Sequence, residues 1–162
     1  MEILQATPND IKILVELANS IWNEYYIKIL SKEQIHYMLN LMYNEKQIAF
    51  ELENDFTWLL FKENDIFIGY ASYSILNNKK YKLHKLYISP KFHGKGFGTQ
   101  AINYIFDDIK NKGGINVSLN VNKNNTSSIK FYEKVGFKIV DDVVLDIGNG
   151  FVMDDYIMEK DL

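Results

Sequence analysis

The sequence contains no cysteine and no arginine, and only 2 prolines among its 162 residues. Without cysteine the chain has no disulfide, no thiol nucleophile and no cysteine-based metal site. This fits a reducing compartment, and we expect the protein to work in the cytoplasm. Without arginine there is no guanidinium fork for bidentate contacts, so a bound phosphate must be held by backbone N–H groups, lysines and hydroxyls.

Other absences narrow the range of functions. No apolar run is long enough to cross a bilayer, and the first residues do not form a signal-peptide pattern. The 3 histidines form no metal-binding motif, so we expect no metal. A formal net charge of −3 argues against bulk nucleic-acid binding and is compatible with cationic substrates.

What is present fits one domain that covers residues 1–162. This length suffices for one proper core and is short for two. The 47% of apolar and 24% of charged residues are ordinary for a globular domain. Hydrophobic spacing and turn residues predict helices and strands in a mixed order. The predicted strands cover residues 2–6, 56–62, 66–76, 81–89, 115–121, 136–144 and 151–159, and the helices cover 10–20, 31–43, 45–52, 97–112 and 125–134.

One stretch organises the rest of the chain. It consists of a β-prone segment at 83–88, a turn with Gly94, Gly96 and Gly98, and the start of a helix. Glycine allows positive φ and lets the backbone approach a ligand closely. A helix start also presents free N–H groups and the positive end of the helix dipole, which together bind phosphate. The stretch therefore predicts a phosphate-binding loop, or otherwise a plain glycine-rich connection from strand to helix.

Two well-known phosphate loops do not match its spacing. Thr99 stands where the dinucleotide-binding fingerprint needs its third glycine. In the Walker pattern a serine or threonine must follow the Gly-Lys pair, and here Gly96 follows Lys95. A nucleotide-binding protein is therefore the weaker interpretation.

A second stretch, at residues 125–137, reads Asn-Thr-Ser-Ser-Ile-Lys-Phe-Tyr-Glu-Lys-Val-Gly-Phe and follows a predicted strand. Together the two stretches resemble the GNAT superfamily of acyl-CoA-dependent N-acetyltransferases. The first is similar to the family's pyrophosphate motif, in which Gln or Arg stands three residues before the first of two alternating small residues. The second is similar to its Asn-x-x-Ala-x-x-Phe-Tyr-x-x-x-Gly-Phe helix. His93 and Ser128 depart from the usual Gln or Arg and from the usual Ala.

The resemblance covers about residue 56 to the C-terminus and implies both a fold and an activity. The implied fold is α/β (α+β): a single-domain GNAT-like fold with a central mixed, mostly antiparallel sheet of about seven strands and helices on both faces. The implied reaction moves an acetyl group from acetyl-CoA to a primary amine, by direct attack in a ternary complex. The helical region before the second strand would shape the acceptor pocket.

The resemblance also assigns residues to the cofactor. Those implied to bind acetyl-CoA are Leu86, Tyr87, Ile88, His93, Gly94, Lys95, Gly96, Phe97, Gly98, Thr99, Asn125 and Tyr132. Asn125 is otherwise a plain helix N-cap. Tyr132 matches the tyrosine that protonates the departing thiolate, and is otherwise a core tyrosine beside Phe131. A phenol and a thiol have similar enough acidities to exchange a proton without a large penalty.

The sequence offers several candidates for the general base that removes a proton from the amine. Many GNAT enzymes carry a glutamate on the fourth strand, near the place of His84 here. An imidazole can accept a proton near neutral pH, so His84 is the first candidate, although it can equally be structural. Lys85 is a poor substitute. Glu24, Glu51 or Tyr73 can instead relay a proton through water.

Within the superfamily the chain looks most like bacterial PaiA-like polyamine acetyltransferases. The similarity lies in residues 29–35, 86–88 and 155–160, and it implies spermidine, spermine or a related amine as substrate. The candidate substrate-binding residues are Trp22, Glu24 and Tyr25, with Glu24, Asp154 and Asp155 as carboxylates for a polycation.

Several alternatives stay open. An aminoglycoside, another small amine or a protein N-terminus can be the acceptor, and a non-catalytic CoA-binding sensor or partner protein can use the same fold. The resemblance also implies that the chain can form a homodimer, through a sheet edge or through residues 151–153.

Overall fold

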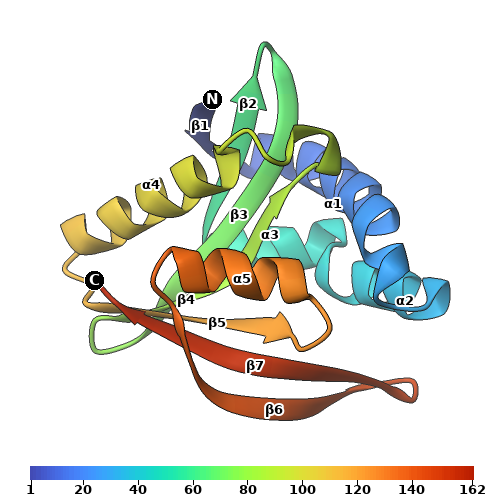
Figure 1. The fold of residues 1–162 in the computed structure, drawn as a ribbon. Coiled ribbons are helices and arrows are strands. Elements are labelled where there is room, and N and C mark those ends of the chain that lie inside the picture. The colour runs from blue at the N-terminus through green and yellow to red at the C-terminus, as the bar shows by residue number, and fades with distance from the viewer.

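All strands of the protein join a single sheet in the computed structural model, which describes residues 1–162 (Figure 1). The strands are β1 (Glu2–Gln5), β2 (Thr57–Glu63), β3 (Ile66–Asn77), β4 (Lys80–Ile88), β5 (Asn116–Asn122), β6 (Lys138–Gly148) and β7 (Phe151–Asp161). The helices are α1 (Ile11–Tyr25), α2 (Lys32–Met42), α3 (Glu45–Glu53), α4 (Phe97–Asn111) and α5 (Thr126–Lys134). Short 3-10 turns lie at η1 (Pro8–Asp10), η2 (Tyr26–Lys28) and η3 (Pro90–Phe92).

The sheet is mixed and mostly antiparallel, as predicted. Its order is β1-β2-β3-β4-β5-β7-β6, and only β4 and β5 run parallel. Parallel neighbours need a crossover connection, which α4 supplies. The expected sheet with helices on both faces is therefore confirmed.

Each face of the sheet carries its own apolar cluster. On one face α4 packs Ile102 and Phe106 against Val117 and Leu119 of β5. On the other face α1, α2 and α3 form a second cluster around Trp58. Figure 1 shows α1, α2 and α3 grouped together, apart from α4 and α5. Alternating side chains of the central strands serve both clusters, which explains the nearly continuous apolar runs in β2 and β3.

Polar caps fix the helix starts. The side chain of Ser31 accepts a hydrogen bond from the Gln34 backbone N–H at 3.1 Å, so Ser31 is the N-cap of α2. Asn44 caps α3 in the same way at 2.9 Å. The caps set where α2 and α3 begin, and these helices pack beside α1 to close the second apolar cluster.

Strand β4 contains one extra residue at its centre. Across from it on β3, Tyr73 faces Leu83 and the next residue, Ser72, faces Lys85, so His84 forms a bulge. A bulge shifts the alternation of side chains by one. Leu83 accordingly packs into the cluster under α4, whereas Lys85 reaches Glu51 on the opposite face.

The parallel strands β4 and β5 separate just after this bulge. Their pairing ends at Leu83 and Leu119, although β4 continues to Ile88 and β5 to Asn122. From residue 84 onward the backbone of β4 therefore has a strand partner on one side only. This gap in the sheet is the feature around which the site is built.

Strand β6 lies at the edge of the sheet and is exposed along most of its length. None of the helices has the length and apolarity needed to cross a membrane. The cytoplasmic location and the absence of a metal stay predictions.

Candidate active site

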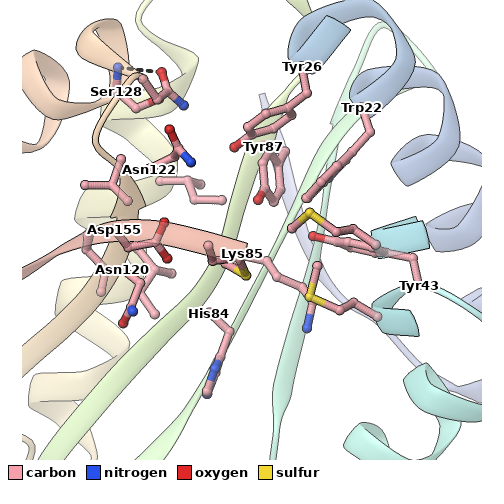
Figure 2. Close-up of a pocket in the computed structure, with 18 of the residues that line it drawn as sticks. Trp22, Tyr26, Tyr43, His84, Lys85, Tyr87, Asn120, Asn122, Ser128 and Asp155 are labelled. Atoms are coloured by element: carbon pink, nitrogen blue, oxygen red, sulfur yellow. Dashed lines mark hydrogen bonds between the residues drawn. The ribbon is translucent and has the colours of Figure 1, made fainter. Parts of the chain in front are cut away.

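A cavity of about 540 Å³ opens where β4 and β5 separate. It is lined by the two diverging strands and by residues of α1, η2, α2, α5 and β7. Figure 2 shows two contrasting walls: Trp22, Tyr26 and Tyr43 lie on one side, and Asn120, Asn122 and Asp155 on the other. The cavity is large enough to hold two small reactants side by side.

The first wall is aromatic. The ring of Trp22 lies 4.5 Å from that of Tyr26, 5.4 Å from that of Tyr43 and 5.8 Å from that of Tyr87, measured between centroids. Burial raises the pKa of Tyr26 to about 12 and holds the pKa values of Tyr43 and Tyr87 well above the ordinary value of a phenol. These phenols keep their protons at neutral pH, so the wall is uncharged. Such a surface suits an alkyl chain or an ammonium group over a ring.

The second wall is polar and comes from β5 and β7. Asn122 is the register partner of Asp155, and the side chain of Asn120 lies beside them (Figure 2). Asp155 is only 1% exposed. Burial raises the pKa of its carboxyl above the ordinary value. The cavity thus places a buried carboxyl opposite an uncharged aromatic surface.

A buried ion pair lies beside the aromatic wall. The Nζ atom of Lys85 lies 3.0 and 2.9 Å from the two carboxylate oxygens of Glu51 on α3. The same ammonium group sits 4.7 Å from the ring centroid of Trp58. Burial lowers the pKa of Lys85, while the charge of Glu51 opposes that shift. Lys85 is therefore a charge held by a specific partner, which makes it unsuited to act as a free base.

The open edge of β4 can bind an extended ligand. Leu86, Tyr87 and Ile88 line the cavity and pair with β3 on their other side. Their backbone groups that face β5 have no strand partner. An extended chain can add to such an edge as a strand does, through main-chain hydrogen bonds.

The glycine turn leads from this edge into α4. Gly94 and Gly96 have φ values of +75° and +81°, and Gly96 is the residue before the first turn of α4. A Cβ atom on either glycine meets nothing within 4 Å, so a steric clash is not the reason for glycine here. The reason is the positive φ, which residues with a side chain rarely adopt. The free N–H groups of the first helical turn, at Phe97, Gly98 and Thr99, provide an anion site. The predicted cofactor residues that do not line the cavity are Gly94, Lys95, Gly96, Phe97, Gly98 and Thr99.

His93 closes the turn onto the end of β4. Its Nε2 donates a hydrogen bond to the carbonyl of Ile88 at 2.7 Å, and its ring lies edge-on to Tyr25 at 5.9 Å between centroids. The side chain is therefore used to hold the loop. The contact of His93 with a phosphate stays a prediction.

Helix α5 brings Asn125 and Tyr132 to the cavity. The Oδ1 atom of Asn125 accepts hydrogen bonds from the Ser128 backbone N–H at 3.2 Å and from the Tyr25 hydroxyl at 2.9 Å. Asn125 is thus a helix N-cap, and its contact with a cofactor stays a prediction. Tyr25 ties the end of α1 to the start of α5 at the mouth of the cavity.

Tyr132 lines the cavity from the second turn of α5. Its ring packs 5.3 Å from Phe131 and 5.6 Å from Phe137, between centroids. Burial raises the pKa of Tyr132 above the ordinary value of a phenol. The hydroxyl therefore stays protonated at neutral pH, and its O–H group is part of the cavity wall.

The sequence matches a protein-family model. The model, for the Acetyltransferase (GNAT) family, matches residues 14–137, which is more than half of the chain. This chain is a GNAT acetyltransferase. The enzyme class and acetyl-CoA as the cofactor, both predicted from the two motifs, are confirmed.

Individual relatives agree with the family assignment. The spermidine N(1)-acetyltransferase of Thermoplasma acidophilum is 27% identical over 159 residues, covering 95% of this chain and 96% of that protein. A crystal structure of the PaiA N-acetyltransferase from Thermoplasma acidophilum in complex with coenzyme A matches with a TM-score of 0.86 at 27% identity, covering 99% of this chain and 98% of that one. A GCN5-related N-acetyltransferase from Rhodopseudomonas palustris shares the fold, with a TM-score of 0.83 at 19% identity and coverage of 99% and 95%.

In this GNAT structure the predicted site residues divide into two groups. Those that line the cavity are Trp22, Tyr25, His84, Leu86, Tyr87, Ile88, His93, Asn125 and Tyr132. Glu24 does not line the cavity. It lies two positions after Trp22 on α1, so its side chain is on a different face of the helix and is exposed. Asp154 is also outside the cavity and pairs with Lys123 at 2.7 Å.

His84 has surroundings that weaken it as a base. Its Nε2 lies 2.8 Å from the Ser74 hydroxyl, and its ring packs 4.8 Å from Phe56. Burial, together with the charges of Lys85 and Lys82, lowers the pKa of His84 to about 4. Figure 2 shows its ring pointing away from Trp22 and Tyr26. Its role as the general base stays a prediction.

Sequence reasoning did not single out Tyr26, Tyr43 or the bulge. The predicted first helix stopped at residue 20, whereas α1 continues to Tyr25 and passes directly into η2. A longer helix would have placed Tyr26 four residues after Trp22, on the same face. Tyr43 follows α2 directly and carried no comparable signal in the sequence.

Proposed function

We propose that this GNAT enzyme acetylates a primary amine of a polyamine such as spermidine, by direct attack in a ternary complex with acetyl-CoA. One observation carries the proposal: a single cavity contains the open edge of β4, Tyr132 and a buried carboxyl opposite aromatic rings. The open edge of β4 can pair with the pantetheine arm that carries the thioester, and Tyr132 can protonate the leaving thiolate. The buried carboxyl and the aromatic rings suit a cationic amine with an alkyl chain. The chain works, in this proposal, as one domain over residues 1–162.

The residues have separate roles in this reaction. Backbone N–H groups of residues 93–99 hold the pyrophosphate of the cofactor, and Leu86, Tyr87 and Ile88 pair with its pantetheine arm. A β4 N–H that faces the thioester carbonyl stabilises the oxyanion that forms when the neutral amine attacks. The C–S bond then breaks, and Tyr132 gives its proton to the departing thiolate.

A polyamine is supported by a relative and by the cavity. The similar protein from Thermoplasma acidophilum is named as a spermidine acetyltransferase. The cavity offers an uncharged aromatic wall for methylene groups and a buried carboxyl for an ammonium group. Trp22 and Tyr25, the two proposed substrate residues that line it, lie at its α1 side.

The test is thiol release from acetyl-CoA with a panel of amines, with acetylated products identified by mass spectrometry. We expect spermidine and spermine to be turned over with kcat/KM at least about 10-fold above that for an aminoglycoside or a peptide N-terminus, because the cavity has a carboxyl and a narrow apolar wall. Turnover of another amine without polyamines would contradict the polyamine substrate and keep the enzyme class. Binding of coenzyme A without turnover of any amine would favour the non-catalytic alternative.

We further propose that the chain forms a homodimer through the edge of the sheet formed by β6 and the β6–β7 hairpin. Val140 and Val144 of β6 and Val152 of β7 are at least half exposed. An exposed edge strand with apolar side chains is a ready partner for a second copy. Light scattering should give twice the chain mass of 19.0 kDa; a monomer at micromolar concentration would contradict the dimer.

A further inference from the structure

We propose that Asp155 is a catalytic residue that binds the reacting ammonium group of the acceptor and takes its proton. This inference rests on the proposed function, and it names a general base, which the sequence analysis left open. Asp155 is 1% exposed, it lines the cavity, and its Oδ1 atom has no hydrogen-bond partner. A buried carboxylate oxygen without a partner is costly unless a ligand supplies one. A protonated amine supplies both the charge and the donor.

The position of Asp155 follows from the register of β7. Its neighbours in sequence, Tyr156 and Asp154, point elsewhere: Tyr156 packs against the cluster under α4, and Asp154 pairs with Lys123. Met153, two residues before it, packs against the cluster under α1. Asp155 therefore faces the α1 side of the sheet, as alternation along a strand requires. That is the side on which the aromatic wall stands.

Asp155 also lies beside the gap where the cofactor would sit. Its register partner is Asn122, three residues beyond Leu119, the last residue of β5 that pairs with β4. Asn122 and Asp155 thus line the part of the cavity that the separation of the strands creates. Asp155, Tyr26 and Trp22 line one cavity, with the carboxyl on the wall opposite the aromatic rings (Figure 2).

The charges around Asp155 leave it free to act as a base. Burial is the main cause of its raised pKa, and the charge of Asp154 adds to it. A side-chain hydrogen bond with Asn120 and the charges of Lys82 and Lys123 oppose the shift, so only the Oδ1 atom of the carboxyl is without a hydrogen-bond partner. Lys123 is already paired with Asp142 at 2.6 Å and with Asp154 at 2.7 Å. No cation forms an ion pair with Asp155, in contrast to Glu51, which Lys85 neutralises. Of the two buried acidic side chains in the cavity wall, Asp155 is the one without a resident cation.

The proton balance of the step is simple. The acceptor enters as an ammonium ion and gives one proton to the Asp155 carboxylate. The neutral amine then attacks the thioester carbon, so that a C–N bond forms and the C–S bond breaks. Tyr132 protonates the thiolate and regains a proton from the amide nitrogen as the tetrahedral intermediate collapses. Asp155 releases its proton to solvent, which gives a net loss of one proton per turnover.

The test compares Asp155→Asn with the matched control Asp154→Asn, the adjacent residue outside the cavity. In Asp155→Asn we expect kcat/KM for spermidine to fall by about 100-fold or more, as for the loss of a general base. The dissociation constant for coenzyme A and the melting temperature should stay close to the wild-type values. Asp154→Asn should keep kcat/KM within about threefold of wild type, since it removes a partly exposed ion pair outside the cavity and only a secondary contribution to the pKa of Asp155.

Two further readouts separate proton transfer from a structural role. The wild-type pH profile of kcat/KM should fall at low pH as Asp155 is protonated, and this limb should disappear in Asp155→Asn. With 2,2,2-trifluoroethylamine, a primary amine that is already neutral at pH 7.5, the loss in Asp155→Asn should shrink by about 10-fold or more relative to spermidine. An equal loss with both amines, or an unchanged acidic limb, would overturn the proposal.

The outcomes also distinguish this inference from the substrate proposal. If the wild-type enzyme turns over another amine and no polyamine, the polyamine proposal fails, and the same variants are compared on that amine. Full activity of Asp155→Asn on any acceptor that wild type uses overturns the role of Asp155 while the substrate assignment stands. A loss of coenzyme A binding as large as the loss in kcat/KM would likewise overturn it, because the residue would then be structural.

Discussion

Replacing Tyr132 with phenylalanine is expected to lower kcat by about 100-fold or more, with coenzyme A affinity within about twofold of wild type. The phenol keeps its proton because burial raises its pKa, and it lines the cavity into which β4 presents its open edge. Phenylalanine preserves the packing with Phe131 and Phe137 and removes only the hydroxyl. Steady-state kinetics with a saturating amine and calorimetric titration with coenzyme A give the two values.

Tyr156→Phe is the matched control for this variant. Tyr156 also packs against the cluster under α4 and lies outside the cavity, so removal of its hydroxyl should leave kcat within about twofold. Unchanged turnover in Tyr132→Phe would contradict the role of Tyr132 as proton donor. Loss of coenzyme A affinity in parallel with kcat would indicate that the hydroxyl serves binding instead.

Replacing Lys85 with methionine is expected to lower the free energy of unfolding by about 3–5 kcal/mol. Both ends of the Lys85–Glu51 pair are more than nine-tenths buried, with side-chain exposures of 8% and 7%. The single replacement leaves the carboxylate of Glu51 in the protein interior without its cation. Urea denaturation followed by circular dichroism measures the change, provided that the slope of the transition is unchanged.

The double variant Lys85→Met with Glu51→Leu tests the physical reason for that loss. Two well-packed apolar residues in place of a buried ion pair are often neutral or stabilising. We therefore expect the double variant to regain most of the stability that the single variant loses. A double variant as unstable as Lys85→Met would contradict this explanation, and would show that the length and packing of the lysine chain matter more than its charge.

The parts of the fold that sequence reasoning predicted well are those with local causes. Gly94 and Gly96 adopt positive φ and lead into α4, as a turn between a strand and a helix requires. Ser31 caps α2 because its hydroxyl reaches an N–H only three residues away. Element types followed from hydrophobic period, and boundaries differed by several residues: β6 was predicted to end at 144 and extends to Gly148.

The rest of the site depends on contacts between distant parts of the chain. Lys85 and Glu51 are 34 residues apart, and Tyr25 meets Asn125 across 100 residues. The bulge at His84 exists only relative to β3, and the gap only relative to β5. Asp154 and Asp155 look alike in sequence, and only the register of β7 directs Asp154 to Lys123 and Asp155 into the cavity. No local pattern distinguishes them.

The central claim is that the gap between β4 and β5 holds coenzyme A beside Tyr132, and a crystal structure of the protein with coenzyme A tests it most directly. We predict that the pyrophosphate lies against the backbone of residues 93–99 and that the pantetheine arm runs along Leu86–Ile88. The thiol should lie within hydrogen-bond reach of the Tyr132 hydroxyl. An arm bound outside the gap, or a thiol out of reach of Tyr132, would contradict the account.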